Sequence, residues 1–419
     1  MKQSPTEKIL VIAESIDIED SSGSKANVAL IKNLKRAGFE VLVYHYTRKI
    51  INLDSIPCIA IKENRRSLLF YLSRLQRKLQ HIFHWNLSKY LEPGIGFSFT
   101  FLNDSKSIRK SIRSMKNFEP DLVLTLSKGA SFRPHHALLE LPEYYDKWMA
   151  YIHDPYPFHL YPEPYSWSEP GYQKKVNFFN QVSIKCRWAV FPSLLLAEWM
   201  QKPFPQFKGK SIIIPHQISD DEKKNKLKFP EYFDLSKFNL LHAGNLMKQR
   251  NPSSLIEAFQ IFMERHPDAV NDSRLLFLGN YSFYKNQLNQ KENLIKQLYV
   301  SDGYVEYESV LQMQHLSSVN IILESVSDIS PFLPGKFPHC VEANKPILHL
   351  GPSKSEVRRL LGEKYEFATE ANDIKNIVKI LEILYHNWKI DSKILKLNRP
   401  DLENYLSVDY LKKQIERCL

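Results

Sequence analysis

Residues 240–259 read LLHAGNLMKQRNPSSLIEAF and form the most informative segment of the chain. The pattern predicts a buried strand that ends at Ala243, a turn at Gly244 and then a helix. Asn251 is a good N-cap, and Pro252 stands at the first helical position, where its missing N–H costs nothing. We expect an anion site here, because free backbone N–H groups and the positive end of the helix dipole point at one spot.

Arg250 stands immediately before this predicted helix. Its planar guanidinium offers a bidentate fork that suits phosphate oxygens. An ordinary strand–turn–helix with a surface arginine would have the same pattern, so this segment alone leaves both interpretations open.

Size and composition predict a soluble protein of two domains. A chain of 419 residues exceeds a single core, and an apolar content of 43% with 25% charged residues is typical of globular proteins. No apolar run approaches the ~20 residues of a membrane span, and the polar start MKQSPTEK lacks the apolar core of a signal peptide. The four cysteines have no metal-ligand spacing, which fits a reducing cytoplasm. The formal charge of +11 favours an acidic partner.

The first half of the chain begins with a βαβ pattern. Residues 8–14, KILVIAE, predict a buried parallel strand, and a helix and the strand FEVLVYHY follow. The loop between strand and helix carries Gly23 at the carboxyl end of the first strand, where ligands of open α/β sheets bind. No G-x-G-x-x-G is present, so a tightly held dinucleotide is not indicated.

Residues 65–91, from Arg65 to Leu91, predict a basic amphipathic helix, because leucines recur at helical spacing among arginines and lysines. Such a helix either lies on an anionic membrane surface or covers the sheet with a solvated basic face. Nucleic-acid binding is not expected, since no aromatic-and-basic module of a known kind is visible.

A later strand of the first half, WMAYIH, ends at His153 and is followed by Asp154. The segment from there to Gly171 is rich in proline and aromatic residues, which predicts a long functional loop rather than regular structure.

The second half repeats the alternation of strands and helices, which indicates a parallel sheet wrapped on both faces. We therefore predict an α/β protein of two Rossmann-like domains facing a central cleft. We expect a helix and strand at 285–298 and 304–307, and a capping box of Ser353 and Glu356. The predicted parts are an N-terminal domain at 1–215, a hinge at 216–237, a C-terminal domain at 238–400, and a helix at 401–419 that packs anywhere, including back on the first domain.

With residues 244–250, GNLMKQR, set beside residues 330–346, SPFLPGKFPHCVEANKP, the chain resembles the family 4 glycosyltransferases. These are retaining, nucleotide-sugar-dependent enzymes of the GT-B fold. In the family, an arginine and a lysine hold the donor diphosphate. Here Asn245 replaces the arginine and Arg250 stands for the lysine, so Lys248 or Lys336 would have to make up the charge.

The family's pair of glutamates, with seven residues between them, is degenerate in this chain. Counting back from Asn344-Lys345-Pro346 puts His339 at the second glutamate, which binds the nucleotide ribose, and Pro331 at the first. Glu342 lies one helical turn beyond. The resemblance implies catalytic roles for His153 and Asp154. It implies that the donor is held by Gly23, Gly244, Asn245, Arg250, Gly279, Lys336, His339 and Glu342.

Breaking a nucleotide–sugar bond leaves negative charge on the diphosphate, which cations stabilise without the need for a metal ion. No Asp-x-Asp pair that could hold a metal stands in a suitable loop. His153, as a neutral imidazole, is expected to polarise a sugar hydroxyl or position the acceptor. We therefore expect a metal-independent glycosyltransferase without a cofactor, cytoplasmic or peripheral at the inner membrane face, that adds sugar to a polysaccharide or lipid-linked oligosaccharide. A non-catalytic nucleotide-sugar-binding protein and a nucleotide-sugar 2-epimerase are the alternatives.

Overall fold

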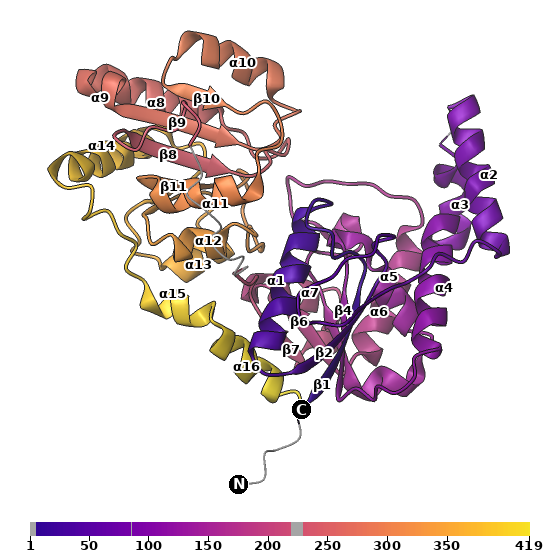
Figure 1. Cartoon of the computed structure of the whole chain (residues 1–419). Helices are drawn as coiled ribbons and strands as arrows, with labels where there is room; N and C mark the ends of the chain where they lie inside the picture. Colours follow the sequence, from indigo (N-terminus) through magenta and orange to yellow (C-terminus); the bar gives the residue numbers. More distant parts are fainter. Residues whose placement is uncertain (1–5, 85, 219–228) are drawn as a thin grey trace, which may run out of the picture. The chain divides into compact units, whose positions relative to one another are not determined.

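The structure, a computed structural model, describes residues 6–84, 86–218 and 229–419. The chain divides into two compact units, each built on one parallel β-sheet (Figure 1). Unit 1 comprises Met1–Tyr161, Ser166–Asp220 and Leu406–Leu419, and unit 2 comprises Pro162–Tyr165 and Asp221–Tyr405. Part of the predicted hinge at 216–237, residues 219–228, lies outside the described residues.

Unit 1 contains a seven-stranded sheet in the order β3-β2-β1-β4-β5-β6-β7. Its strands are β1 (Lys8–Ala13), β2 (Glu40–His45), β3 (Cys58–Ala60), β4 (Leu122–Leu126), β5 (Trp148–Tyr151), β6 (Trp188–Phe191) and β7 (Ser211–Ile213). Successive residues of β1 enter two different cores: Leu10 and Ile12 face one, and Ile9 and Val11 face the other. The sheet is therefore covered on both faces, which is why its strands read as unbroken apolar runs.

The helices of unit 1 are distributed between these two cores. α1 and α16 pack on one face, and α4, α5, α6 and α7 pack on the other. The helical elements are α1 (Ser22–Arg36), α2 (Leu68–Phe83), α3 (Ser88–Ile95), α4 (Phe99–Arg113), η1 (Gly129–Ser131), α5 (Arg133–Leu138), η2 (Pro142–Lys147), η3 (Phe158–Leu160), α6 (Tyr172–Lys185), α7 (Leu194–Gln201), η4 (Pro205–Phe207) and α16 (Val408–Glu416).

Unit 2 contains a six-stranded parallel sheet in the order β10-β9-β8-β11-β12-β13. Its strands are β8 (Phe238–Ala243), β9 (Ser273–Leu278), β10 (Leu298–Val300), β11 (Val319–Leu323), β12 (Ile347–Leu350) and β13 (Ala368–Thr369). Its helices are α8 (Ser253–Arg265), α9 (Pro267–Asp272), α10 (Lys285–Leu294), α11 (Tyr307–Leu316), α12 (Phe337–Glu342), α13 (Glu356–Leu361), α14 (Ile374–Ile390) and α15 (Pro400–Tyr405). The prediction of two parallel-sheet α/β domains is confirmed.

Several local predictions in the second half are wrong. Residues 304–307 form no strand, and the edge strand of the sheet is β10. The helix predicted to run to residue 298 ends at Leu294, which leaves Leu298 free to begin this strand. Ser355, not Ser353, caps α13, since its hydroxyl accepts from the N–H of Arg358 at 2.9 Å. Helix α8 begins at Ser253, one residue later than predicted.

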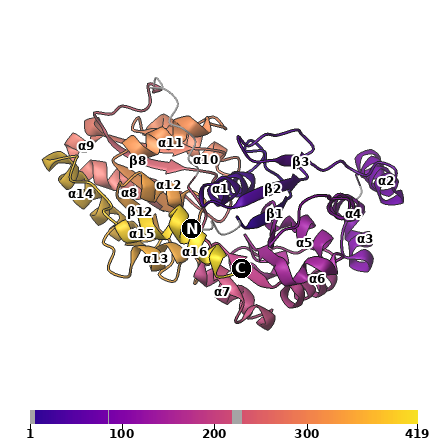
Figure 2. The same cartoon turned by 60° about the horizontal axis from the view of Figure 1, so that its bottom comes forward.

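Two predicted helices are each divided in the structure. The segment 65–91 forms α2 and then α3, and His84 between them has a left-handed backbone with φ of 53°. The segment 401–419 forms α15 in unit 2 and α16 in unit 1. α16 lies beside α1 (Figure 2), and its Leu411 and Ile415 are buried in the core of unit 1.

None of the helices in the described parts of the chain combines the length and the apolar content needed to cross a membrane.

Candidate functional site

Two glycine turns meet at the carboxyl ends of β8 and β9. Gly244 has φ of 123° and Gly279 has φ of 145°, conformations that side-chain-bearing residues rarely adopt. A Cβ on Gly279 would lie 2.7 Å from the carbonyl oxygen of Gly244. No other residue fits at Gly279 without moving the Gly244 turn.

The backbone N–H groups of these turns are already used within the protein. Gly244 N–H donates to Leu278 O at 2.8 Å, and Gly279 N–H donates to Ser301 Oγ at 2.9 Å. Asn245 Oδ1 accepts the N–H of Asn280 at 3.0 Å and so joins the two turns. The N–H groups of the two glycines are therefore occupied, and the glycines themselves contribute a close approach of the two turns.

The start of α8 is also partly occupied. Asn251 Oδ1 accepts the N–H of Ser253 at 2.9 Å, so the asparagine satisfies one of the terminal donors as a cap would.

Lys336 lies against the Gly244 turn. A Cβ on Gly244 would lie 3.7 Å from Lys336 Nζ, so the glycine leaves open the space beside this ammonium group. Lys336 Nζ is 2.8 Å from Nε2 of His242, a buried residue of β8. Burial lowers the pKa of Lys336 to about 7, and repulsion from Arg250 acts in the same direction. Burial holds the pKa of His242 well below its usual value, so this imidazole is neutral and accepts from the lysine.

Arg250 is half-buried and lies close enough to Lys336 and His242 to lower the pKa of both. Its Nε is buried and has no hydrogen-bond partner within the described part of the chain. Neither cation forms a salt bridge with a described carboxylate. Lys248 instead places its Nζ over the ring of Phe283, 5.8 Å from the centroid, so Lys336 is the lysine at this turn. The nearby carboxylate of Glu324 favours the charged form of Lys336 but forms no salt bridge with it, and two cations without such a bridge make a site suited to an anion.

His339 and Glu342 lie on the short helix α12, which follows Lys336. His339 Nε2 is 3.0 Å from the hydroxyl of Tyr307, and Glu342 Oε2 is 3.8 Å from the ring nitrogens of His315 and His339. Burial opposes ionisation of Glu342, but attraction from the ring nitrogens of His315 and His339 outweighs it and lowers the pKa of Glu342 to about 2. Glu342 is thus a fixed anion held among histidines.

A buried polar cluster, which the sequence analysis missed, anchors the segment leading to Lys336. Glu324 follows β11 and accepts from Ser330 Oγ and from His349 Nε2, each at 2.7 Å. A Cβ on Gly351 would lie 2.6 Å from Glu324 Oε2, so this carboxylate is tightly enclosed. The signal in the sequence was a polar residue at the end of an apolar strand.

In unit 1, Gly23 lies in the first turn of α1. A Cβ there would be 3.1 Å from the N of Gly129, which follows β4 and has φ of 58°. The two glycines allow the start of α1 and the loop after β4 to pass close together at the carboxyl edge of the sheet.

His153 lies at this same edge, after β5, and is held by Asn27 of α1. Asn27 Nδ2 donates to the carbonyls of Ser15 and Ser127, at 3.2 and 3.1 Å, so its Oδ1 accepts from His153 Nε2 at 3.1 Å. Burial, with repulsion from nearby histidines, keeps the pKa of His153 well below its usual value. His153 is therefore neutral with the proton on Nε2, and its buried Nδ1 is an acceptor with no partner among the described residues.

Asp154 is half-buried beside the Gly129 loop, since a Cβ on Gly129 would lie 3.6 Å from its Oδ2. The structure thus brings Gly23, His153 and Asp154 to one edge of unit 1. It brings Gly244, Asn245, Arg250, Gly279 and Lys336 to one edge of unit 2.

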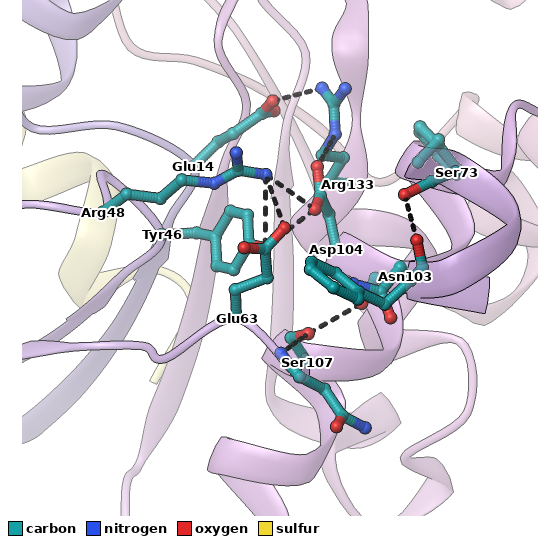
Figure 3. Close-up of polar contacts among 12 residues, drawn as sticks. Glu14, Tyr46, Arg48, Glu63, Ser73, Asn103, Asp104, Ser107 and Arg133 are labelled. Atoms are coloured by element: carbon teal, nitrogen blue, oxygen red, sulfur yellow. Dashed lines mark hydrogen bonds and ion pairs between the residues drawn. The ribbon is translucent and has the colours of Figure 1, made fainter. Parts of the chain in front are cut away.

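A chain of charged residues that the sequence analysis did not single out lies at the same edge of unit 1 (Figure 3). Arg133 binds Glu14 and, at 3.0 Å, Asp104; Asp104 also accepts from Arg48 at 2.9 Å. Arg48 is in turn 3.7 Å from Glu63. Burial of a carboxylate without a partner would be costly, and each of these carboxylates lies beside an arginine.

Among the described residues, no group of three or more His, Cys, Asp or Glu side chains is arranged to hold a metal ion.

The sequence matches no family model and no curated protein. Solved structures similar to the chain include a sucrose-phosphate synthase from Thermosynechococcus elongatus, with 12% identity, a TM-score of 0.64 and 98% of each chain covered. A UDP-forming α,α-trehalose-phosphate synthase from Burkholderia xenovorans, in complex with glucose-6-phosphate, is 9% identical with a TM-score of 0.64, covering 98% of this chain and 99% of that one. The Anabaena protein HepE, in complex with UDP and glucose, is 12% identical with a TM-score of 0.61 and 98% of each chain covered. The predicted GT-B fold of two Rossmann-like domains is confirmed.

Proposed function

We propose that this chain is a metal-independent, retaining glycosyltransferase. It would move a sugar from a nucleoside diphosphate sugar to a polysaccharide or lipid-linked oligosaccharide in bacterial surface glycan synthesis. The observation that carries the proposal is the pair of uncompensated cations, Arg250 and Lys336, at the glycine turns of unit 2. Membership of family 4 is part of the proposal and rests on the sequence motifs.

The chemistry of transfer fits this pair. Breaking a nucleotide–sugar bond leaves negative charge on the diphosphate, which fixed cations stabilise more strongly as the bond breaks. Arg250 offers a buried Nε–H, and Lys336 offers an ammonium that His242 aligns from behind. Lys336 is held by His242, and the Nε–H of Arg250, which has no partner among the described residues, is open to a phosphate oxygen, so the pair would bind a diphosphate without a metal ion.

His153 suits a role at the sugar. Its Nδ1 is an acceptor with no partner among the described residues, so it would accept a hydrogen bond from a sugar hydroxyl. Because the imidazole is neutral, it would not repel the positive character that develops at the anomeric carbon.

The proposed acceptor follows from the family resemblance and from the charge of the chain. Similar structures contain UDP with glucose, or glucose-6-phosphate, and they favour nucleotide-sugar chemistry on this fold. A small sugar phosphate is thus an alternative to a glycan. The family resemblance and the charge of +11 favour an acceptor at an anionic membrane surface, with the enzyme in the cytoplasm or peripheral at the inner face.

A non-catalytic nucleotide-sugar-binding protein is the second candidate. Pro331 and His339 stand where the family has its glutamates, and His339 is engaged by Tyr307. An epimerase is less favoured, because the described residues near Lys336 offer Glu324 as a neighbouring carboxylate and it is engaged by Ser330 and His349.

The test is a transfer assay with radiolabelled UDP-, GDP- and dTDP-sugars and a membrane-extract or sugar-phosphate acceptor. A transferase releases nucleotide and labels the acceptor. For a retaining enzyme, NMR of the product shows the same α or β configuration as the donor. Binding of a nucleotide sugar without any release would favour the non-catalytic protein. Conversion of the free donor into its 2-epimer would favour the epimerase.

A further inference from the structure

Helix α2 turns its apolar side away from the protein. The large apolar side chains exposed on it are Leu68 (73%), Tyr71 (62%), Leu75 (53%), Ile82 (54%) and, at its last residue, Phe83 (51%). At 3.6 residues per turn the first four fall within an arc of about 60° around the helix axis. Together they form a continuous stripe, called the apolar stripe below.

The side of α2 that faces the protein buries two polar residues, beside the half-buried Leu69, Leu72 and Leu79. Its buried residues are Ser73 and Gln76, and Gln76 Nε2 donates to Ser88 Oγ at 3.2 Å. The helix packs on α4 and is capped by Ser67, which also bonds Asn103 of α4. The alternative in which this helix covers the sheet with a solvated basic face is wrong, because α2 packs on α4 and contributes no residue to either described core of unit 1, and the apolar stripe needs another partner.

The charges on α2 itself have one sign, and Glu63, before the helix, lies 3.8 Å from Arg74. Residues 64–91 contain six Lys or Arg residues and no Asp or Glu. Arg74, Arg77 and Lys78 are exposed and lie along one flank of the stripe. An apolar arc beside a basic flank is the pattern of helices that lie in the plane of an anionic bilayer.

The base of α2 is tied to the ligand-binding edge of unit 1. Glu63, before the helix, is 3.7 Å from Arg48, which follows β2 and binds Asp104. Arg133 continues the chain of charges to Glu14 at the end of β1 (Figure 3). In both views of the molecule α2 stands at the outer margin of unit 1, beyond α4 (Figures 1 and 2). A surface bound by α2 would therefore lie next to the sheet edge that carries His153.

We propose that α2 docks the protein on an anionic lipid bilayer. The apolar stripe enters the boundary between headgroups and acyl chains, and Arg74, Arg77 and Lys78 bind lipid phosphates. Charge complementarity favours a bilayer over a second copy of this chain, because two copies would bring like basic flanks together. Docking rests on this surface alone; its use to reach a lipid-linked acceptor rests on the proposed function.

The experiment is co-sedimentation of the full chain with vesicles of phosphatidylcholine, with and without phosphatidylglycerol. We expect binding to the anionic vesicles, weakened by salt. The variant Leu68→Ser/Leu75→Ser/Ile82→Ser should lose about tenfold or more in partitioning. The matched control is Leu294→Ser/Ile390→Ser/Ile394→Ser, which removes three equally exposed apolar side chains of unit 2 and should bind as the wild type does.

Three results would overturn docking: no binding of the wild type to anionic vesicles, equal loss in both triple variants, or equal binding to uncharged vesicles. Light scattering tests whether a second copy of the chain occupies the apolar stripe instead. A wild-type dimer that becomes a monomer in the stripe variant would assign this face to a second copy. Calorimetry with nucleotide sugars on the same proteins keeps the two proposals apart. Vesicle binding without nucleotide binding would defeat the proposed function and leave docking intact. Nucleotide binding without vesicle binding would defeat docking and leave the proposed function intact.

Discussion

Raising the pH from 6 to 8 should weaken the binding of a nucleoside diphosphate sugar about tenfold, because the Lys336 ammonium loses its proton in this range. Burial lowers the pKa of Lys336 to about 7, so about nine-tenths of the molecules carry the charge at pH 6 and about one-tenth at pH 8. A bound diphosphate favours the charged form and raises this pKa, so binding takes up a proton. Affinity is therefore full below pH 7 and falls as the pH rises through 7.

The neighbours of Lys336 define the control. His242 stays neutral across the range, because its pKa lies well below the usual value, and burial raises the pKa of the Cys340 thiol to about 12. The variant Lys336→Arg keeps a charge at every pH, so its affinity for the donor should not depend on pH. The variant Lys336→Met should bind the donor weakly at every pH from 6 to 8.

The assay is calorimetry with a nucleotide sugar, whose doubly esterified diphosphate does not titrate here, in buffers of different ionisation enthalpy. An affinity that stays constant from pH 6 to 8, or a dependence that persists in Lys336→Arg, would refute the reasoning.

Three further changes test other parts of the structure. Gly279→Ala should lower the free energy of unfolding by about 1–3 kcal/mol and weaken nucleotide-sugar binding, because its Cβ would meet Gly244 O at 2.7 Å. The control is Gly94→Ala, whose Cβ would meet nothing within 4 Å. Equal denaturation midpoints for the two variants would contradict the account. His153→Ala should lower kcat about tenfold, the loss of one hydrogen bond to the sugar, with the donor Kd unchanged; a parallel loss of affinity would indicate a structural role. Arg133→Met should destabilise unit 1 by about 3–5 kcal/mol in urea, since it leaves buried Glu14 without its arginine and Asp104 with Arg48 alone, and a change as small as that of the exposed Lys412→Met would speak against the network.

The sequence was a good guide to the sheets, because parallel strands buried on both faces need unbroken apolar runs such as KILVIAE and FNLLHAG. Short edge strands escaped prediction: β10, with three residues, has too little pattern to separate it from the end of α10. Helix boundaries also shifted where two candidate caps stand close together, as Ser353 and Ser355 do.

The candidate site was predictable only in part. Arg250 and Lys336 follow from motif spacing, but the contact of Lys336 with His242 joins residues 94 positions apart and depends on the fold. Helical periodicity in α2 indicated an apolar stripe without saying which way it faces. Its direction follows only from the folded structure, in which α2 packs on α4 and buries Ser73 and Gln76.

The central claim is that Arg250 and Lys336 neutralise a diphosphate at the glycine turns of unit 2. Titration calorimetry of UDP-, GDP- and dTDP-sugars against the wild type and Arg250→Ala tests it most directly. The account predicts that at least one donor binds the wild type and that its affinity falls by about 1.5–3 kcal/mol in the variant, the value of a charge-assisted hydrogen bond. Binding of equal strength in the two proteins, or no binding of any donor to the wild type, would contradict it.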